Sequence, residues 1–336
     1  MNVAQRWLQE AHRLADKDSE KKTYEKYLNG RYGQAEKGKR AKKRNQRGCL
    51  TKDWKPENLR SNTVLVFGED RIGDEVLTIA CLPNLLSWCG AVSWKCDQKL
   101  KTLFTRSFPG VTFISDQDPK SKSDGTIYSW ELIGRFREQL GDFPWVKDRV
   151  DFMPYLKPST HLRDTLSARY RDGPKKVVGL AWRSERDGEQ LSDKTCDLRE
   201  VPHWAAFFAE LKDKVRFISL QYGNTQDEIE FARWKYGVEI YQDNSIDIFD
   251  DVDAAAAQIS AIDYVVSIST TAAHLAGALG VPGWVLLQAK PFGHWSAGQL
   301  LCPWYPTLRP IRQVSNGCWK SVLEDVTKAV KAELDL

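Results

Sequence analysis

Short apolar segments rich in β-branched and aromatic residues alternate with apolar positions at helical spacing along most of the chain. The first such segment, NTVLVF (62–67), precedes a polar loop and a helical pattern that runs from Leu77 to Leu85. Two further strand segments, 91–96 and 111–114, enclose a short predicted helix over 100–108. This β-α-β-α-β order predicts a parallel sheet, because neighbouring parallel strands need a crossover connection.

The same order of elements begins again after residue 174. Strands are predicted over 175–182, 215–220, 238–241, 264–268 and 284–287, and helices over 204–211, 226–234, 254–262, 272–279 and 319–336. A chain of 336 residues exceeds the size of most single hydrophobic cores. The pattern therefore predicts an α/β protein with two Rossmann-like domains.

The domain boundary is predicted between residues 158 and 172, within a segment that contains several prolines and arginines. We accordingly expect a first Rossmann-like domain over 61–165, a second over 166–318, and a terminal helix over 319–336 that packs across to the first domain. Residues 1–60 combine helical spacing with a basic second half, which predicts a short helical, basic extension.

The composition is that of a globular protein, with 42% hydrophobic and 28% charged residues. The sequence has no apolar run of membrane-spanning length and no signal-peptide pattern, and we therefore expect a cytoplasmic protein. The seven cysteines form no CxxC pair and no Cys/His ligand spacing. Neither a zinc site nor a disulfide framework is predicted, and the cysteines are expected to be reduced thiols.

The net charge of +4 is small, but lysines and arginines are concentrated between residues 37 and 47. One interpretation is a solvated linker. The other is peripheral contact with anionic lipid at the inner face of a membrane. Nucleic acid is not expected as a partner, because neither interleaved aromatic residues nor a nucleic-acid-binding motif accompanies the charges.

The segment SISTTAAH (267–274) places four hydroxyl side chains and a histidine where a strand turns into a helix. Ligands of doubly wound sheets bind at the carboxyl ends of the strands. The helix N-terminus and the hydroxyls of Ser269, Thr270 and Thr271 suit a phosphate or pyrophosphate. Ordinary N-capping explains one of the hydroxyls. His274 is predicted with even weight as a phosphate ligand or as a packed core residue.

The segment GEDRIGDEV (68–76) follows the first strand and contains four carboxylates. A general base is expected at such a turn, and Asp74 is the first choice because it follows Gly73 in the first helical turn. The helix dipole favours any carboxylate there, so spacing alone leaves Glu69, Asp70 and Glu75 equally open.

Further polar residues follow the strands of the second half. Arg183 is a candidate cation for a diphosphate, with pairing to a nearby carboxylate such as Glu185 as the alternative. Gln221 is a candidate for hydrogen bonds to a base or sugar, and Lys194 lies in a long polar loop from which it can approach a ligand. The sequence lacks the motifs GxxxxGK[ST], GxGxxG and GxSxG, which disfavours P-loop enzymes, nicotinamide dehydrogenases and serine hydrolases.

Six segments that follow one another from about Val64 to the C-terminal helix carry a family resemblance. They are GEDRIGDEVLTIACLPNLL, VVGLAWRSE, FISLQYG, FDDVDAAAAQISAIDYVVS, STTAAHLAGALGVPGWVLL and PWYPTLRPIRQ. Together they resemble the glycosyltransferases of family 9, which are related to the lipopolysaccharide heptosyltransferases, and especially the relatives linked to tetratricopeptide repeats. The resemblance implies a GT-B architecture, in which two Rossmann-like domains face a cleft and bind the acceptor and the nucleotide-sugar donor respectively.

The resemblance also implies metal-independent, inverting transfer from a nucleotide-diphosphate sugar, without a further cofactor, to a glycan, lipid-linked or protein acceptor. It places the base on Asp74 and the donor phosphates on Thr271 and His274, with Arg183 at a polar position after the second domain's first strand. Relatives often have Asp-Thr-Ser before the histidine, where this chain has Ser269-Thr270-Thr271.

Lys290 and His294 lie in a segment without a clear match and are further candidate contacts with donor or acceptor. A sugar-stacking surface of tryptophans is a last candidate feature, although a core position is expected for Trp284, which lies in a strand pattern. The tryptophans concerned are Trp182, Trp284, Trp295 and Trp304.

Two other functions remain open from the sequence. A non-catalytic nucleotide-binding or scaffold protein would keep the two-domain fold and hold nucleotide without transferring a sugar. A nucleotide-sugar epimerase of the same architecture would act without an acceptor.

Overall fold

The computed structural model describes residues 60–118, 123–147, 152–171, 173, 175–186, 189–190, 194–289, 294–295 and 302–334. The predicted N-terminal extension up to residue 59, with the basic stretch 37–47, lies outside these residues, as does Lys290. The chain divides into two compact units, with the division between Lys157 and Pro158; His294 and Trp295 belong to the first unit.

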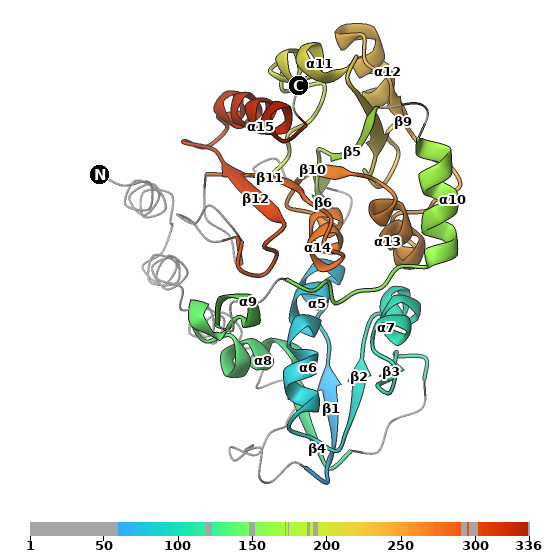
Figure 1. The fold of residues 1–336 in the computed structure, drawn as a ribbon, viewed down its shortest axis with the longest axis vertical. Coiled ribbons are helices and arrows are strands. Elements are labelled where there is room, and N and C mark those ends of the chain that lie inside the picture. Colours follow the sequence, from blue (N-terminus) through green and yellow to red (C-terminus); the bar gives the residue numbers. More distant parts are fainter. Residues whose placement is uncertain are drawn as a thin grey trace. The chain divides into compact units, whose positions relative to one another are not determined.

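The first unit is built around a parallel sheet with the strand order β3-β2-β1-β4 (Figure 1). Its strands are β1 (Thr63–Phe67), β2 (Ala91–Lys95), β3 (Thr112–Ile114) and β4 (Gly125–Tyr128). Its helices are α5 (Ile72–Thr78), α6 (Leu82–Leu86), α7 (Lys101–Ser107), α8 (Ser129–Phe136) and α9 (Pro144–Lys147), with short 3₁₀ turns at Ile79–Cys81, Gln98–Leu100 and Leu140–Asp142. The β1 side chains Val64 and Val66 are fully buried in the core of this unit.

The second unit contains a six-stranded parallel sheet with the order β12-β11-β10-β5-β8-β9. Its strands are β5 (Lys176–Ala181), β8 (Val215–Ser219), β9 (Ile240–Tyr241), β10 (Tyr264–Ile268), β11 (Gly283–Leu287) and β12 (Leu308–Arg312). Its helices are α10 (Thr160–Tyr170), α11 (Trp204–Leu211), α12 (Gln226–Tyr236), α13 (Val252–Ser260), α14 (Thr271–Ala278) and α15 (Trp319–Glu333). A short hairpin of β6 (Glu185–Arg186) and β7 (Glu189–Gln190) follows β5.

The α/β fold and the parallel sheets predicted from the sequence are confirmed. The terminal helix α15 buries Val322, Leu323 and Val326 in the core of the second unit, and its packing across to the first domain stays a prediction. Its apolar positions lie along one face, which this core covers. Within the described residues, no helix has both the length and the apolar character needed to cross a membrane.

The strand orders define a switch point in each sheet. In the first unit the chain runs from β1 to β2 and β3 on one side, and then to β4 on the other side of β1. In the second unit it runs from β5 to β8 and β9, and then to β10 on the other side of β5. Ligands of open parallel sheets bind beyond the carboxyl ends of strands at such points, which directs attention to the turns after β1, β4, β5 and β10.

Candidate active site

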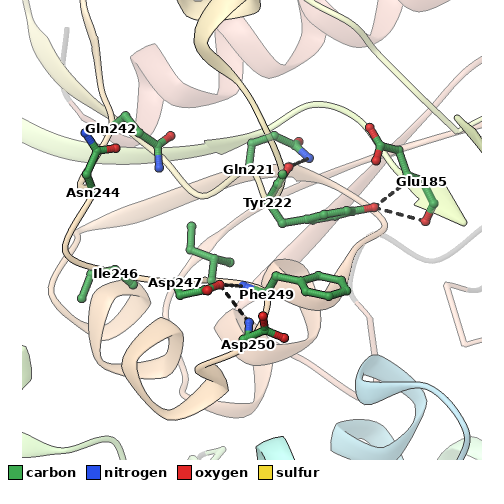
Figure 2. Close-up of a pocket in the computed structure, with 11 residues that line it drawn as sticks. Glu185, Gln221, Tyr222, Gln242, Asn244, Ile246, Asp247, Phe249 and Asp250 are labelled. Carbon is green, nitrogen blue, oxygen red and sulfur yellow. Dashed lines mark hydrogen bonds between the residues drawn. The ribbon is translucent and has the colours of Figure 1, made fainter. Parts of the chain in front are cut away.

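A pocket with a volume of about 750 Å³ lies at the carboxyl ends of β8 and β9 in the second unit (Figure 2). Its walls come from the turn after β8 (221–223), from Gln242 and Asn244 after β9, and from the segment 246–250 that leads into α13. Glu185, at the start of β6, lines another part of it. A volume of this size suits a small molecule or a portion of a nucleotide.

The walls of this pocket are aromatic, amide and acidic. The rings of Tyr222 and Phe249 have centroids 6.0 Å apart and planes inclined by 33°, and Phe249 is 59% exposed. Figure 2 shows the two rings on neighbouring wall segments, with Glu185 beside the Tyr222 hydroxyl. The lining described here contains no lysine or arginine but does contain the carboxylates of Asp247 and Asp250. Such a lining favours an uncharged ring or sugar over a phosphate.

Arg183 follows β5 and is held in a buried ion pair. Its Nε donates to Glu228 Oε1 at 2.7 Å, and the exposed fractions of the two side chains are 6% and 3%. The guanidinium also contacts the carboxylate of Glu185 and donates to the backbone oxygen of Asn224 at 2.8 Å. Burial raises the pKa of Glu228, and the positive charge of Arg183 acts in the opposite direction. The alternative that the sequence left open, pairing with a carboxylate, is the arrangement observed here.

Gln221 connects the ends of two neighbouring strands. Its Oε1 accepts hydrogen bonds from the backbone N–H groups of Trp182 at 3.0 Å and Arg183 at 2.9 Å. The side chain thereby fixes the turn after β5 to the turn after β8, next to the pocket that it lines. Lys194 is half-buried and precedes Thr195, whose hydroxyl accepts a bond from the Ser184 N–H group at 3.2 Å.

The SISTTAAH segment joins β10 to α14 at the switch point of the second sheet. Thr270 has the extended backbone of an N-cap residue but makes no side-chain capping bond. Its hydroxyl lies 3.2 Å from that of Ser267, which donates to the Ile268 backbone oxygen at 2.7 Å. The side chain of Thr270 therefore does not cap α14. Ser269 and Thr271 are half-buried beside the N-terminus of α14, where backbone N–H groups and the helix dipole favour an anion.

His274 lies one turn into α14 and is only 6% exposed. Its Nδ1 is 2.9 Å from the hydroxyl oxygen of Tyr305. All of the residues from Ala272 to Ala278 are buried, and their small side chains allow this close packing. Sequence reasoning missed Tyr305 because 31 residues separate it from His274. The segment PWYPTLRPIRQ contains it but does not indicate its partner.

The turn after β1 holds the predicted base candidates. Glu69 is half-buried, and its Oε1 accepts a hydrogen bond from Ser129 Oγ at 2.7 Å. Ser129 begins α8 directly after β4, so this bond joins the two strand ends at the first sheet's switch point. Asp74 is half-buried in the first turn of α5. Ser129 was not predicted as a site residue, because the strand β4 that precedes it was not predicted either.

Glu75 differs from its acidic neighbours because it is fully buried. It accepts hydrogen bonds from Trp94 Nε1 at 3.1 Å and from the Asp97 N–H group at 3.2 Å. Burial raises the pKa of this carboxyl from 4.5 to about 8, with Asp97 and Glu69 adding smaller repulsions. A side-chain carbon at Gly68 would lie 2.2 Å from Glu75 Oε1, so only glycine fits above it. Glu75 is thus a buried structural acid beneath the turn.

The predicted tryptophan surface does not exist in this structure. All four side chains are between 0% and 2% exposed, and a sugar cannot stack on them in this arrangement. They are Trp182, Trp284, Trp295 and Trp304. Trp182 instead donates to Glu228 at 3.1 Å. His294 is also buried, beside Trp295, and belongs to the first unit.

Comparison with known proteins gives relatives of low sequence identity. No family model matches the sequence. Protein FlbA from Caulobacter vibrioides is 28% identical over 297 residues, which are 83% of this chain and 48% of that protein. The chain thus spans about half the length of this curated relative.

Among solved structures, a family 9 glycosyl transferase from Veillonella parvula superposes with a TM-score of 0.58 at 12% identity, over 82% of this chain and 98% of the other. ADP-heptose lipopolysaccharide heptosyltransferase II from Escherichia coli gives a TM-score of 0.54 at 13% identity, over 81% and 97%. The chain has the fold of these glycosyltransferases. The resemblance found in the sequence is thus confirmed at the level of the fold, which alone does not fix the reaction or the substrates.

Within the described residues, no three His, Cys, Asp or Glu side chains are grouped so that they could hold a metal ion. The hydroxyls of Ser269 and Thr271, the N-terminus of α14 and His274 are the groups best suited to a phosphate. Besides Tyr305 and Ser129, the sequence analysis missed Glu228, the buried partner of Arg183, and the aromatic pair of Tyr222 and Phe249. In the sequence, Tyr222 and Phe249 are isolated aromatic residues within polar segments. Their proximity depends on the order of the strands in the sheet.

Proposed function

We propose that the protein is a glycosyltransferase that transfers a sugar from a nucleoside-diphosphate sugar to a hydroxyl group of an acceptor. The observation that carries this proposal is that the carboxyl edge of the second sheet holds two features, an aromatic pocket lined by amides and carboxylates and the N-terminus of α14, which the side chain of its N-cap residue does not cap. The fold shared with family 9 glycosyltransferases supports the same reaction class.

The donor is assigned to the second unit. We assign the base and ribose to the pocket that contains Tyr222 and Phe249, because its amides form hydrogen bonds and its rings present flat apolar faces. We assign the diphosphate to the α14 N-terminus, with Ser269, Thr271 and His274 as donors. The carboxylates of Asp247 and Asp250 disfavour a phosphate in the pocket itself.

Arg183 has a supporting role in this proposal. Its charge is already neutralised by Glu228 and Glu185, so it holds the turn after β5 rather than meeting the diphosphate directly. Gln221 adds a second bond to the same turn.

In the proposed reaction, Asp74 takes the proton of the acceptor hydroxyl as its oxygen attacks the anomeric carbon. The new carbon–oxygen bond forms as the bond between the anomeric carbon and the diphosphate oxygen breaks, and the nucleoside diphosphate leaves with the electron pair. A single attack from the opposite face inverts the anomeric centre. The helix N-terminus and His274 stabilise the charge that develops on the leaving group, and we propose that no metal ion is required.

The acceptor class in this proposal is a glycan, a lipid-linked saccharide or a protein. Contact of the basic stretch 37–47 with anionic lipid is part of the same proposal, since it would bring the enzyme to a lipid-linked acceptor. A scaffold protein or an epimerase is distinguished by products, because neither releases nucleoside diphosphate while adding a sugar to an acceptor.

Calorimetric titration with UDP, GDP, ADP and CMP, in the presence of a chelator, tests the donor site. We expect one nucleoside diphosphate to bind selectively and the Thr271→Val variant to bind it several-fold more weakly. Thr327→Val is the matched control, because Thr327 lies on α15 and its hydroxyl donates to the Leu323 backbone oxygen of the same helix at 2.6 Å. If no nucleotide binds to the wild type, the donor assignment is wrong and the scaffold function takes its place.

A further inference from the structure

His274 and Tyr305 form a buried pair between α14 and the turn that precedes β12. The Nδ1 atom of His274 lies 2.9 Å from the Tyr305 hydroxyl oxygen. The rings meet edge to face, with centroids 5.6 Å apart and planes inclined by 83°. Tyr305 is 0% exposed and His274 is 6% exposed. Burial makes this hydrogen bond stronger than it would be in water.

Tyr305 is held in place from several sides. A side-chain carbon at Gly277 would lie 2.2 Å from Tyr305 Cγ, so the tyrosine ring rests directly on the backbone of α14. The Tyr305 N–H group donates to the Cys302 oxygen at 3.0 Å, and the Leu308 N–H group donates to the Tyr305 oxygen at 2.9 Å. The phenol therefore has a fixed position relative to His274, which lies one turn before Gly277 on the same helix.

The chemistry of the two groups gives the bond a direction. A phenol O–H is a better donor than a neutral imidazole N–H, and an imidazole nitrogen is a better acceptor than a phenol oxygen. The hydrogen bond at one ring nitrogen decides which nitrogen carries the proton. A hydroxyl that donates to Nδ1 keeps the imidazole proton on Nε2.

We propose that Tyr305 is a positioning residue that holds His274 as the Nε2–H tautomer, so that the histidine donates a hydrogen bond to the leaving diphosphate. This inference rests on the proposed glycosyltransferase function for its ligand, a nucleoside diphosphate. It adds a residue from outside the SISTTAAH segment to the phosphate site. The glycine at position 277 fits this arrangement, because a side-chain carbon there would collide with the Tyr305 ring.

Nuclear magnetic resonance of protein labelled with ¹⁵N-histidine tests the tautomer without any ligand. Loss of one set of signals in His274→Gln assigns the residue among the five histidines. We expect the Nε2–H form in the wild type, and an Nδ1–H form or a mixture in Tyr305→Phe, which keeps the ring but removes the hydroxyl. Tyr170→Phe is the matched control, because Tyr170 is a buried tyrosine of the same unit whose hydroxyl bonds Asp243 at 2.8 Å.

Two results would overturn the inference: an Nδ1–H tautomer in the wild type, or an unchanged tautomer in a folded Tyr305→Phe variant. The wild-type spectrum decides the first point even if the variant fails to fold. Titration with the nucleoside diphosphate that the wild type binds then tests the role. We expect Tyr305→Phe to weaken binding about two- to tenfold and Tyr170→Phe to leave it unchanged.

Equal affinity in Tyr305→Phe and wild type, together with a changed tautomer, would overturn the positioning role while leaving the donor site intact. A tautomer that depends on Tyr305 in a protein that binds no nucleoside diphosphate would contradict the proposed function instead. The two failures are therefore distinguishable.

Discussion

Ser129 donates a hydrogen bond of 2.7 Å from its hydroxyl to Glu69, although 60 residues separate the two in the chain. Glu69 follows β1 and Ser129 follows β4, and these strands are neighbours at the switch point of the first sheet. The bond fixes one carboxylate of the turn, while Asp74 lies in the first turn of α5. The two acids therefore have different surroundings, which makes their roles separable by mutation.

Asp74→Asn should reduce turnover by about 10²- to 10⁴-fold, the usual contribution of a general base. The affinity for nucleoside diphosphate should stay unchanged, because the donor is assigned to groups of the second unit. Initial rates of sugar transfer and calorimetric titration on the same protein check the two parts.

Glu69→Gln is the matched control for the base. It changes a neighbouring carboxylate in the same way and retains an oxygen to accept the bond from Ser129. A large loss of turnover in this variant, together with normal turnover in Asp74→Asn, would move the base to Glu69.

Glu75 should make the stability of the protein depend on pH. Its pKa is about 8 in the folded protein against an ordinary value of 4.5, so the folded state keeps a proton that the unfolded state has lost between these pH values. The free energy of unfolding should therefore be highest below about pH 4.5 and fall as the pH rises toward 8, by at most about 1.4 kcal/mol per pH unit from this group.

Glu75→Gln removes this titration. Its free energy of unfolding relative to the wild type should rise between pH 5 and pH 8, as measured by urea denaturation at several pH values. The same substitution at the exposed Glu230 is the control. Parallel pH curves for wild type and Glu75→Gln would show that the buried carboxyl does not retain its proton.

Periodicity was sufficient for most central strands and the helices between them, but not for elements whose sequence lacks a clear pattern. β12 contains Pro310, which disfavours a strand unless it lies at a sheet edge, and β12 is the edge strand of its sheet. α10 is polar on most of its surface and therefore lacks a clear apolar periodicity. Its start is marked by the N-cap residue Ser159, whose hydroxyl accepts a hydrogen bond from the Leu162 N–H group at 3.4 Å.

The site residues also divide into those that the sequence pattern predicts and those that it does not. The strand-end position of Gln221 followed from the alternation of elements, because every strand of a parallel sheet ends at the same edge. The buried partners Glu228 of Arg183 and Tyr305 of His274 did not follow from it, since they lie 45 and 31 residues away in the chain. Whether a charged or polar side chain is available to a ligand depends on these tertiary partners.

Phe249→Ala should weaken binding of the nucleoside diphosphate if the base stacks in the pocket. Stacking on an aromatic side chain contributes roughly 1–3 kcal/mol per base, which corresponds to about 5- to 150-fold in affinity. Trp234→Ala is the matched control, because Trp234 on α12 is also exposed, at 77%, but does not line the pocket. Equal affinity of Phe249→Ala and Trp234→Ala would exclude the proposed base site.

The pair of Arg183 and Glu228 should contribute more to stability than the pair of Arg183 and Glu185. Glu228 is 3% exposed and Glu185 is 35% exposed. Glu228→Gln should lower the free energy of unfolding by on the order of 3 kcal/mol, because it leaves a buried cation without its main partner. Glu185→Gln should cost less than about 1 kcal/mol, since water screens the more exposed pair.

The double variant Arg183→Met and Glu228→Met distinguishes a structural role of Arg183 in holding the turn after β5 from a direct role in binding the diphosphate. Replacing both charges with apolar side chains should recover most of the stability lost in Glu228→Gln, as measured by chemical denaturation. Because Arg183 is already neutralised by carboxylates, nucleoside diphosphate affinity in the double variant should remain within about twofold of the wild type. A stable double variant with strongly reduced affinity would instead make Arg183 a direct ligand of the diphosphate, which would require Glu185 to release it when the donor binds.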